Sequence, residues 1–257
     1  MSPFNGLLKE CCGHDGVAWG LHLSFHCPEL IEFCGLLGFQ WLFLDAEHQP
    51  LHHERCRELV RAADLVGMPC MVRVPRIDAV VIEGFLDAGV AGILAPNVTS
   101  ADQAQTLVAA VKFAPEGRRG AADRSRAANY GLTHHPTDYR RQSNRTTMTA
   151  ALIESRDGVE ALESIMAVPG LDCLALGRND LGLSLGVDTG MADPQVRACV
   201  QDAETRIKAC GKAQLTIVAD AGEARKARVD GARFIAVSDA TLLSGAGSVY
   251  LERVIRA

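Results

Sequence analysis

A repeated pairing of a glycine with a short apolar run limits the folds that this chain can adopt. Four segments place a glycine directly before six residues of strand character, and these glycines are Gly38, Gly89, Gly170 and Gly231. A glycine at such a point suits the left-handed end of a helix, from which a short loop returns the chain to a sheet. The repeat therefore predicts strands that alternate with helices, which is the pattern of a parallel sheet.

Hydrophobic periodicity extends this alternation along the chain. The expected strands are 16–23, 39–45, 69–74, 90–95, 148–153, 171–176, 213–218 and 234–237. The expected helices are 28–37, 51–66, 78–88, 100–112, 158–168, 193–210, 222–229 and 240–255. No G-x-G-x-x-G follows the first strand, which counts against an open dinucleotide-binding sheet. At 257 residues, we predict one α/β domain over residues 1–257, a closed (β/α)8 TIM barrel.

One connection departs from the alternation. Residues 114–147 show little periodicity and carry seven arginines between Arg118 and Arg145 against two aspartates. The segment is longer than most loops, so it covers the site, supplies a subunit contact or is a solvated basic excursion. The sequence leaves these alternatives open.

Net charge and composition limit the kinds of partner that the chain can bind. The formal net charge of −5 argues against a general nucleic-acid binder. No apolar run reaches the ~20 residues of a membrane span, and the N-terminal residues lack a signal-peptide apolar region. The nine cysteines are odd in number and form no C-x-x-C. We therefore expect a cytoplasmic protein with reduced cysteines and neither a nucleic-acid nor a membrane partner.

Charged residues gather where the predicted strands end, and in an α/β barrel the carboxyl ends of the strands form the active site. In order along the chain, these residues are Asp45, Glu47, His48, Arg73, Glu154 and Asp180. Arg73, inside the apolar run MVRVP, is the most informative of them, because a buried guanidinium needs an anion. That anion is a structural carboxylate or a bound carboxylate or phosphate, and we favour the bound ligand.

The two carboxylates that follow neighbouring strands suggest a metal site. Glu154 and Asp180 have no His or Cys at ligand spacing beside them, which suits a hard divalent ion that keeps waters and binds substrate oxygens. The alternative for Asp180 is that it caps the next turn. His48 could then act as a general base oriented by Asp45 or Glu47. No lysine ends a predicted strand, so a Schiff-base aldolase is the weaker alternative.

These residues, in this order, resemble the HpcH/HpaI aldolase family of metal-dependent class II pyruvate aldolases, and the resemblance covers nearly the whole chain. It rests on G-F-x-W-L-x-x-D-x-E-H at 38–48, V-R-V-P at 72–75, G-x-R-G at 117–120, S-R-A-A-N-Y-G at 125–131, I-E at 153–154 and G-x-x-D-L at 177–181. The resemblance implies a barrel of the phosphoenolpyruvate/pyruvate-binding type. It also implies cleavage or formation of a carbon–carbon bond beside a pyruvate enolate, with 4-hydroxy-2-oxo acids as substrates.

The resemblance assigns a role to each matching position. It makes Glu154 and Asp180 the metal ligands and Arg73 the residue that holds the keto oxygen and carboxylate. It makes His48 the catalytic base acting with Asp45, and it places Glu47 near metal-bound water. Gly177 and Leu181 would present backbone amides to the pyruvate carboxylate. The metal expected is Mg²⁺ or Mn²⁺, with Co²⁺ or Zn²⁺ as alternatives.

The chain also departs from the family pattern. Arg178 and Gly182 stand where the family usually has Pro and Ser, and Arg178 could alter the carboxylate-binding loop or select an acidic acceptor. The implied partners are a small keto acid and an aldehyde, together with further copies of the chain in a homo-oligomer, a hexamer by resemblance. A related lyase or decarboxylase that acts through pyruvate enolate, or a non-catalytic keto-acid-binding barrel, remains an alternative.

Overall fold

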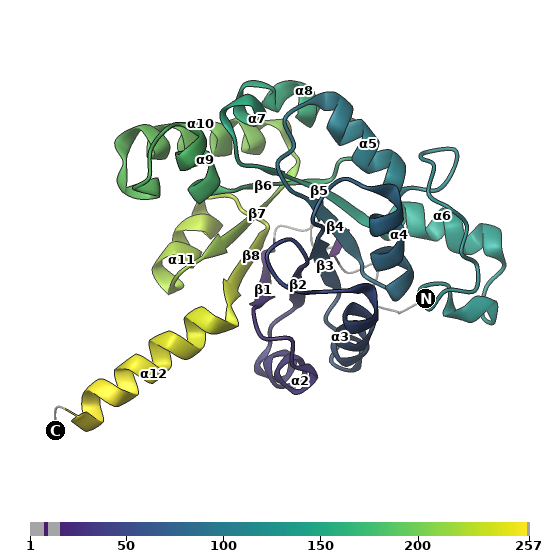
Figure 1. Cartoon of the computed structure of the whole chain (residues 1–257), viewed down its shortest axis with the longest axis horizontal. Helices are drawn as coiled ribbons and strands as arrows, with labels where there is room; N and C mark the ends of the chain where they lie inside the picture. The colour runs from purple at the N-terminus through teal and green to yellow at the C-terminus, as the bar shows by residue number, and fades with distance from the viewer. Residues whose placement is uncertain (1–7, 10–15, 256–257) are drawn as a thin grey trace.

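The strands close into a barrel in the order in which they occur along the chain. In the computed structural model, which describes residues 8–9 and 16–255, every neighbouring pair of strands is parallel and β1 pairs with β8. The strands are β1 Ala18–Leu23, β2 Trp41–Asp45, β3 Cys70–Arg73, β4 Gly92–Ala95, β5 Met148–Ile153, β6 Cys173–Leu176, β7 Ala213–Val218 and β8 Phe234–Ser238. The prediction of a (β/α)8 TIM barrel is confirmed (Figure 1).

Helices surround the barrel, with one or more following each strand. They are α2 Pro28–Leu37, α3 His53–Leu65, α4 Ala79–Ala88, α5 Ala101–Val111, α6 Pro136–Thr146, α7 Arg156–Glu160, α8 Leu162–Met166, α9 Arg178–Ser184, α10 Pro194–Cys210, α11 Ala221–Asp230 and α12 Asp239–Ile255. Two short 3-10 helices are η1 Asn129–Gly131 and η2 Gly190–Ala192. Within the described residues no helix combines the length and hydrophobicity that a membrane span requires.

The four glycines of the repeat adopt the conformation that the sequence requires of them. Their φ angles are +103° at Gly38, +107° at Gly89, +83° at Gly170 and +103° at Gly231. This left-handed backbone is costly for residues with a Cβ atom. The glycines let the chain leave a helix or turn and re-enter the sheet within one or two residues.

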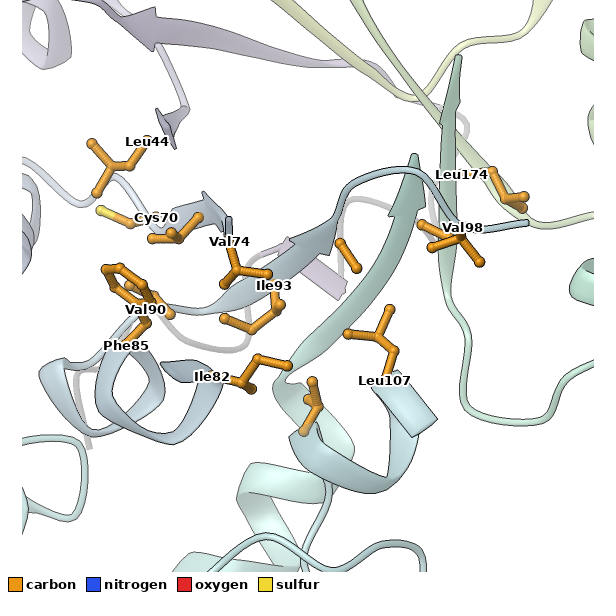
Figure 2. Close-up of a cluster of buried hydrophobic side chains, with 14 of the residues drawn as sticks. Leu44, Cys70, Val74, Ile82, Phe85, Val90, Ile93, Val98, Leu107 and Leu174 are labelled. Atoms are coloured by element: carbon orange, nitrogen blue, oxygen red, sulfur yellow. The ribbon is translucent and has the colours of Figure 1, made fainter. Parts of the chain in front are cut away.

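Two apolar layers hold the barrel together. One fills the barrel interior with side chains such as Trp41, Phe43 and Phe234. The other lies between the strands and the helices, and Figure 2 shows part of it, with Phe85 of α4 and Leu107 of α5 on either side of strand residue Ile93. Burial on both faces explains why the strands are apolar almost throughout, until the charged residues at their carboxyl ends.

The prediction for residues 114–147 was incomplete, because this connection contains η1 and helix α6. Helix α6 buries polar residues, Ser143 and Asn144 beside Tyr139, so no apolar stripe marks it in the sequence. Arg119 of this segment is buried, donates to Asp87 at 2.8 Å and stacks over the Phe113 ring. The connection thus packs against the outer helices and contributes no residue to the mouth cavity described below.

Two further differences concern helices. The predicted helix 158–168 is two short helices, α7 and α8, separated at Ala161. Helix α9 was not predicted, because seven residues are too few to show periodicity.

Helix α12 is arranged differently from the other helices. It projects away from the barrel as a separate yellow helix (Figure 1). Its start is anchored, since the carboxylate of Asp239 accepts from the backbone amides of Ser24 and Phe25 at 2.8 and 3.0 Å.

Candidate active site

A buried carboxylate and a guanidinium form an ion pair where β2 and β3 end. Asp45 and Arg73 are register partners. The guanidinium of Arg73 donates from Nε to Asp45 Oδ1 at 3.0 Å and from Nη2 to Oδ2 at 2.6 Å. Burial by itself raises the pKa of Asp45, but the hydrogen bonds and charge of Arg73 outweigh it and hold that pKa below its ordinary value.

This pair contains the structural carboxylate that the sequence allowed as one of two partners for Arg73. Parallel register places Asp45 beside it. Nevertheless, Arg73 lines the cavity at the barrel mouth, and no hydrogen bond from its Nη1 atom to a described residue is present. The Nη1 edge of the Arg73 guanidinium therefore remains available to a ligand.

The loop after β2 is organised by the same carboxylate. Asp45 Oδ1 accepts from the backbone amides of Glu47 at 2.9 Å and His48 at 3.3 Å. The His48 side chain is 64% exposed, and its Nε2 atom lies 3.7 Å from Glu47 Oε2. Asp45 therefore positions the backbone of His48, while Glu47 is the carboxylate nearest to its ring.

Glu154 is the most strongly perturbed carboxyl group of the mouth. It follows β5 directly, is 8% exposed, and its Oε1 atom accepts from the backbone amide of Asn97 at 2.8 Å. Burial raises the pKa of Glu154 to about 7, and the negative charges of Glu47 and Asp180 add to the effect. Burial likewise raises the pKa of Glu47. The carboxylates of Glu47, Glu154 and Asp180 therefore lie close enough at the carboxyl ends of the strands to repel one another.

A glycine makes room for the Glu154 carboxylate. A Cβ atom built on Gly177 would lie 2.5 Å from Glu154 Oε2 and 2.5 Å from its Cβ, far inside contact distance. Gly177 directly follows β6 and is the N-terminal cap of α9. The close approach of β6 to Glu154 is thus possible only without a side chain at this position.

Four of the predicted residues share one cavity of about 480 Å³ at the mouth. These are Arg73, Glu154, Gly177 and Asp180. Leu181, by contrast, is buried in the apolar layer outside the strands. The backbone N–H of Gly177 donates to Ile153 O at 2.9 Å, and that of Leu181 to Gly177 O at 2.9 Å. Both amides already have acceptors, which argues against their predicted part in binding the carboxylate of pyruvate.

The mouth fits a hard divalent cation by its donor set. Glu154 and Asp180 bring carboxylate oxygens to one cavity, and a cation there would offset the repulsion that raises the pKa of Glu154. Glu47 Oε2 is covered and lacks a hydrogen bond, although Arg73 Nε lies 3.2 Å away. Among residues 8–9 and 16–255, no group of three or more His, Cys, Asp and Glu side chains has metal-ligand spacing. Further ligands would therefore have to be water or substrate oxygens.

Three residues of the site were missed by sequence reasoning or placed differently by it. Asn97, at φ +45°, holds Glu154 through its backbone, and only its position two residues after β4 could have pointed to it. His22 lines the cavity from β1. Arg178 also lines it, but its Nη2 atom donates outward to Glu204 at 3.1 Å and to Thr216 at 3.3 Å.

The fold and the mouth together define a class of protein, a (β/α)8 barrel enzyme with an acidic cluster and an arginine at the carboxyl ends of its strands. Residues 19–244 match the HpcH/HpaI aldolase/citrate lyase family. The chain belongs to this family, and it is accordingly a carbon–carbon lyase.

Curated relatives of the chain carry aldolase names. The chain is 33% identical over 244 residues to a hydroxypyruvate/pyruvate aldolase of Paraburkholderia phytofirmans, a match that covers 93% of each chain. It is 34% identical over 234 residues to a 5-keto-4-deoxy-D-glucarate aldolase of Shigella boydii, which covers 91% of this chain and 90% of the relative.

Solved structures agree with the same assignment. An HpcH/HpaI aldolase/citrate lyase family protein from Burkholderia cenocepacia superimposes with a TM-score of 0.91 at 31% identity. That match covers 98% of this chain and 100% of the other.

Proposed function

We propose that the chain is a metal-dependent aldolase that cleaves 4-hydroxy-2-oxo acids into pyruvate and an aldehyde, or joins these two. The observation that carries the proposal is the cavity that Arg73 shares with Glu154 and Asp180. A guanidinium edge and a carboxylate pair suited to a divalent ion are the groups that a 2-oxo acid requires, with its two adjacent oxygen functions. The names of the relatives from P. phytofirmans and S. boydii support this substrate class.

Glu154 and Asp180 would hold the ion, which we take to be Mg²⁺ or Mn²⁺. When bound, a divalent cation supplies Lewis-acid stabilisation of negative charge on the keto oxygen. Asn97 fixes one oxygen of Glu154 through its backbone amide, which leaves Oε2 directed toward Gly177. The site is thus preorganised from three neighbouring strand ends.

The chain's own residues account for the remaining steps. In cleavage, the C4 hydroxyl loses its proton as the C3–C4 bond breaks, which releases the aldehyde and leaves the electron pair of that bond in the enolate. A proton added to C3 then gives pyruvate. Arg73 binds the keto acid and stabilises the developing negative charge, held in orientation by Asp45. His48 takes the C4 proton through a water, since its exposed ring lies beside the site and not within the cavity.

A metal-supplemented assay tests this function. We expect 4-hydroxy-2-oxo acids to release pyruvate with Mg²⁺ or Mn²⁺, and EDTA to abolish the release. Glu154→Gln and Asp180→Asn should each lower turnover about a hundredfold or more. The exposed Glu160, the last residue of α7, provides the matched control Glu160→Gln, which should keep full activity.

Other outcomes separate the alternatives. Keto-acid binding without turnover would support the non-catalytic barrel. Release of carbon dioxide with bond formation would support the related decarboxylase. Pyruvate release that persists in EDTA and in Glu154→Gln would refute the metal-dependent mechanism.

We also propose a homo-oligomer in which α12 of one copy packs on another. The apolar residues Leu243, Tyr250, Val254 and Ile255 of this helix are all more than half exposed. A groove of about 410 Å³ beside the start of α12 is lined mostly by apolar groups, including Trp19, Phe39, Ile235, Val237 and Leu242. A helix with many exposed apolar side chains beside an apolar groove is typical of a protein interface.

The cysteines support a cytoplasmic location for this assembly. None of the cysteines that the structure describes is in a disulfide. Reduced cysteines are usual in the cytosol and unusual in secreted proteins.

A further inference from the structure

One histidine that lines the mouth cavity has a ring nitrogen without a hydrogen-bond partner. His22 lies on β1, and its register partner on β2 is Phe43. The two rings meet edge to face with centroids 4.9 Å apart. His22 lines the mouth cavity, yet its Nε2 atom is covered and forms no hydrogen bond with any described residue.

His22 lies deeper in the barrel than the charged groups. Its partner Phe43 is two residues before Asp45, which ends β2 beside Arg73. The apolar side chains of Phe43, Leu94, Leu152, Ala175 and Leu215 also line the cavity, and together with His22 we call them its floor. His22 is the polar member of this set.

The ring is suited to a neutral hydroxyl group. Burial lowers the pKa of His22, so the imidazole is uncharged at pH 7 and has one donor and one acceptor nitrogen. A covered nitrogen without a partner costs free energy that a bound polar group can recover. Packing against Phe43 does not require a histidine, because a phenyl ring would make the same edge-to-face contact.

We propose that His22 is a specificity-determining residue that hydrogen-bonds a hydroxyl group on the keto acid held by Arg73, Glu154 and Asp180. The inference rests on the proposed aldolase function and names the substrate class more closely. Pyruvate ends in a methyl group, which satisfies no polar group of the floor. Hydroxypyruvate carries a hydroxyl group on the same carbon. The chain therefore prefers hydroxypyruvate to pyruvate as the partner of an aldehyde.

Both additions follow the same stoichiometry. C3 of the keto acid loses a proton and bonds to the aldehyde carbon, while the aldehyde oxygen gains a proton. The two keto acids differ only in the substituent on C3, so a change in their ratio reports on the contact with that substituent.

The test compares kcat/KM for hydroxypyruvate and for pyruvate with the same aldehyde and Mn²⁺. His22→Phe should lower kcat/KM for hydroxypyruvate about tenfold to a hundredfold more than it lowers kcat/KM for pyruvate. His22→Asn, which keeps a donor and an acceptor, should restore part of the ratio. His26 is the matched control, since its Nε2 atom is also covered and unpaired but the residue does not line the cavity. His26→Phe should leave the ratio unchanged.

Two results would overturn the inference. One is a folded His22→Phe enzyme with the wild-type ratio, and the other is an equal loss with both keto acids, which would indicate a structural role. Calorimetric binding of each keto acid with Mn²⁺ but without aldehyde distinguishes this failure from failure of the proposed function. If wild-type protein shows no turnover but a preference for hydroxypyruvate that His22→Phe abolishes, the aldolase proposal fails and the role of His22 stands.

Discussion

At the scale of single residues, the buried carboxyl group of Glu154 links the mouth to pH. Its pKa is raised from 4.5 to about 7 in the folded protein, so the folded state binds more protons than the unfolded state between these values. The stability associated with this group is fully present below about pH 4.5 and is lost as the pH rises through about 7. The affinity for the metal ion should instead rise with pH, since the ion competes with the proton for the Glu154 carboxylate.

These opposite signs give the first prediction. The melting temperature of metal-free protein should fall as the pH rises from about 5 to about 8, while the increase in melting temperature caused by Mn²⁺ should grow over the same interval. Glu154→Gln should remove both effects, and Glu160→Gln neither. Thermal denaturation across this pH series measures both. A metal effect that is independent of pH would contradict the assignment of Glu154 as a ligand.

Gly177 supports Glu154 by its lack of a side chain. The added methyl group of Gly177→Ala would overlap Glu154 at 2.5 Å, which should displace the carboxylate. We expect a loss of about 1–3 kcal/mol in the free energy of unfolding, together with weaker metal binding. Gly16→Ala is the control, because a Cβ atom at Gly16 meets nothing within 4 Å. Denaturant unfolding and metal titration of both variants decide the point; normal metal affinity in Gly177→Ala would show that the carboxylate adapts.

His48 allows a test of base catalysis. As a general base it should contribute about 10²–10⁴ in rate, so His48→Ala should lower turnover sharply and leave metal binding nearly intact. His52 is an exposed histidine at the start of α3, and His52→Ala should be close to wild type. Steady-state kinetics with metal titration separates the roles: loss of the metal would make His48 a ligand, and unchanged turnover would make it a surface residue.

At the scale of elements, the ends of β2 and β3 act as one unit. Arg73 uses two nitrogens for Asp45, and Asp45 in turn holds the backbone of the loop after β2. Register between parallel strands makes the pair, so each member depends on the other for its orientation. A guanidinium can bind Asp45 along one edge and a ligand along another, whereas an ammonium cannot.

Arg73→Lys should therefore fail to rescue function. Charge-assisted hydrogen bonds contribute about 1.5–3 kcal/mol each, so kcat/KM should fall tenfold to a few hundredfold. Inhibition by pyruvate should weaken in parallel. Arg76→Lys is the matched control, since Arg76 is exposed and pairs with Asp78 outside the cavity. Full activity and full pyruvate inhibition in Arg73→Lys would leave the pair with Asp45 as the whole role of this arginine.

At the scale of the whole molecule, α12 leaves apolar surface uncovered. It begins at the end of β8 but projects from the barrel (Figure 1), and its apolar residues are exposed along its length. A helix with this composition gains stability by burial against another surface. The apolar groove beside α11 and β8 is a surface of matching character.

We expect the wild-type chain to be an oligomer in light scattering. The double substitution Leu251→Glu with Val254→Glu should shift it toward smaller species, because both side chains are more than half exposed in a single copy and would be buried in the assembly. Arg253→Glu, which changes a charge between them, should keep the wild-type mass. A monomeric wild type at micromolar concentration would contradict the proposed packing of α12 on another copy.

Local sequence patterns are enough to predict the alternation of strands and helices and the residues at which the strands end. Both are local properties, because a glycine after a helix and an apolar run of fixed length act through their immediate neighbours. For this reason the eight strands could be predicted within about two residues, and so could the position of Glu154 after β5. Helix α6 escaped prediction because its buried face is polar.

The group that each charged residue contacts depends on how the strands are arranged in the folded barrel. Asp45 and Arg73 are 28 residues apart in the chain, and Asn97 and Glu154 are 57 apart. Closure of the barrel and its register bring them together, and register is a property of the whole sheet that no local pattern contains. The same reason explains why His22, inside an ordinary-looking strand, could be recognised as part of the cavity only once β1 had been placed beside β2 and β8.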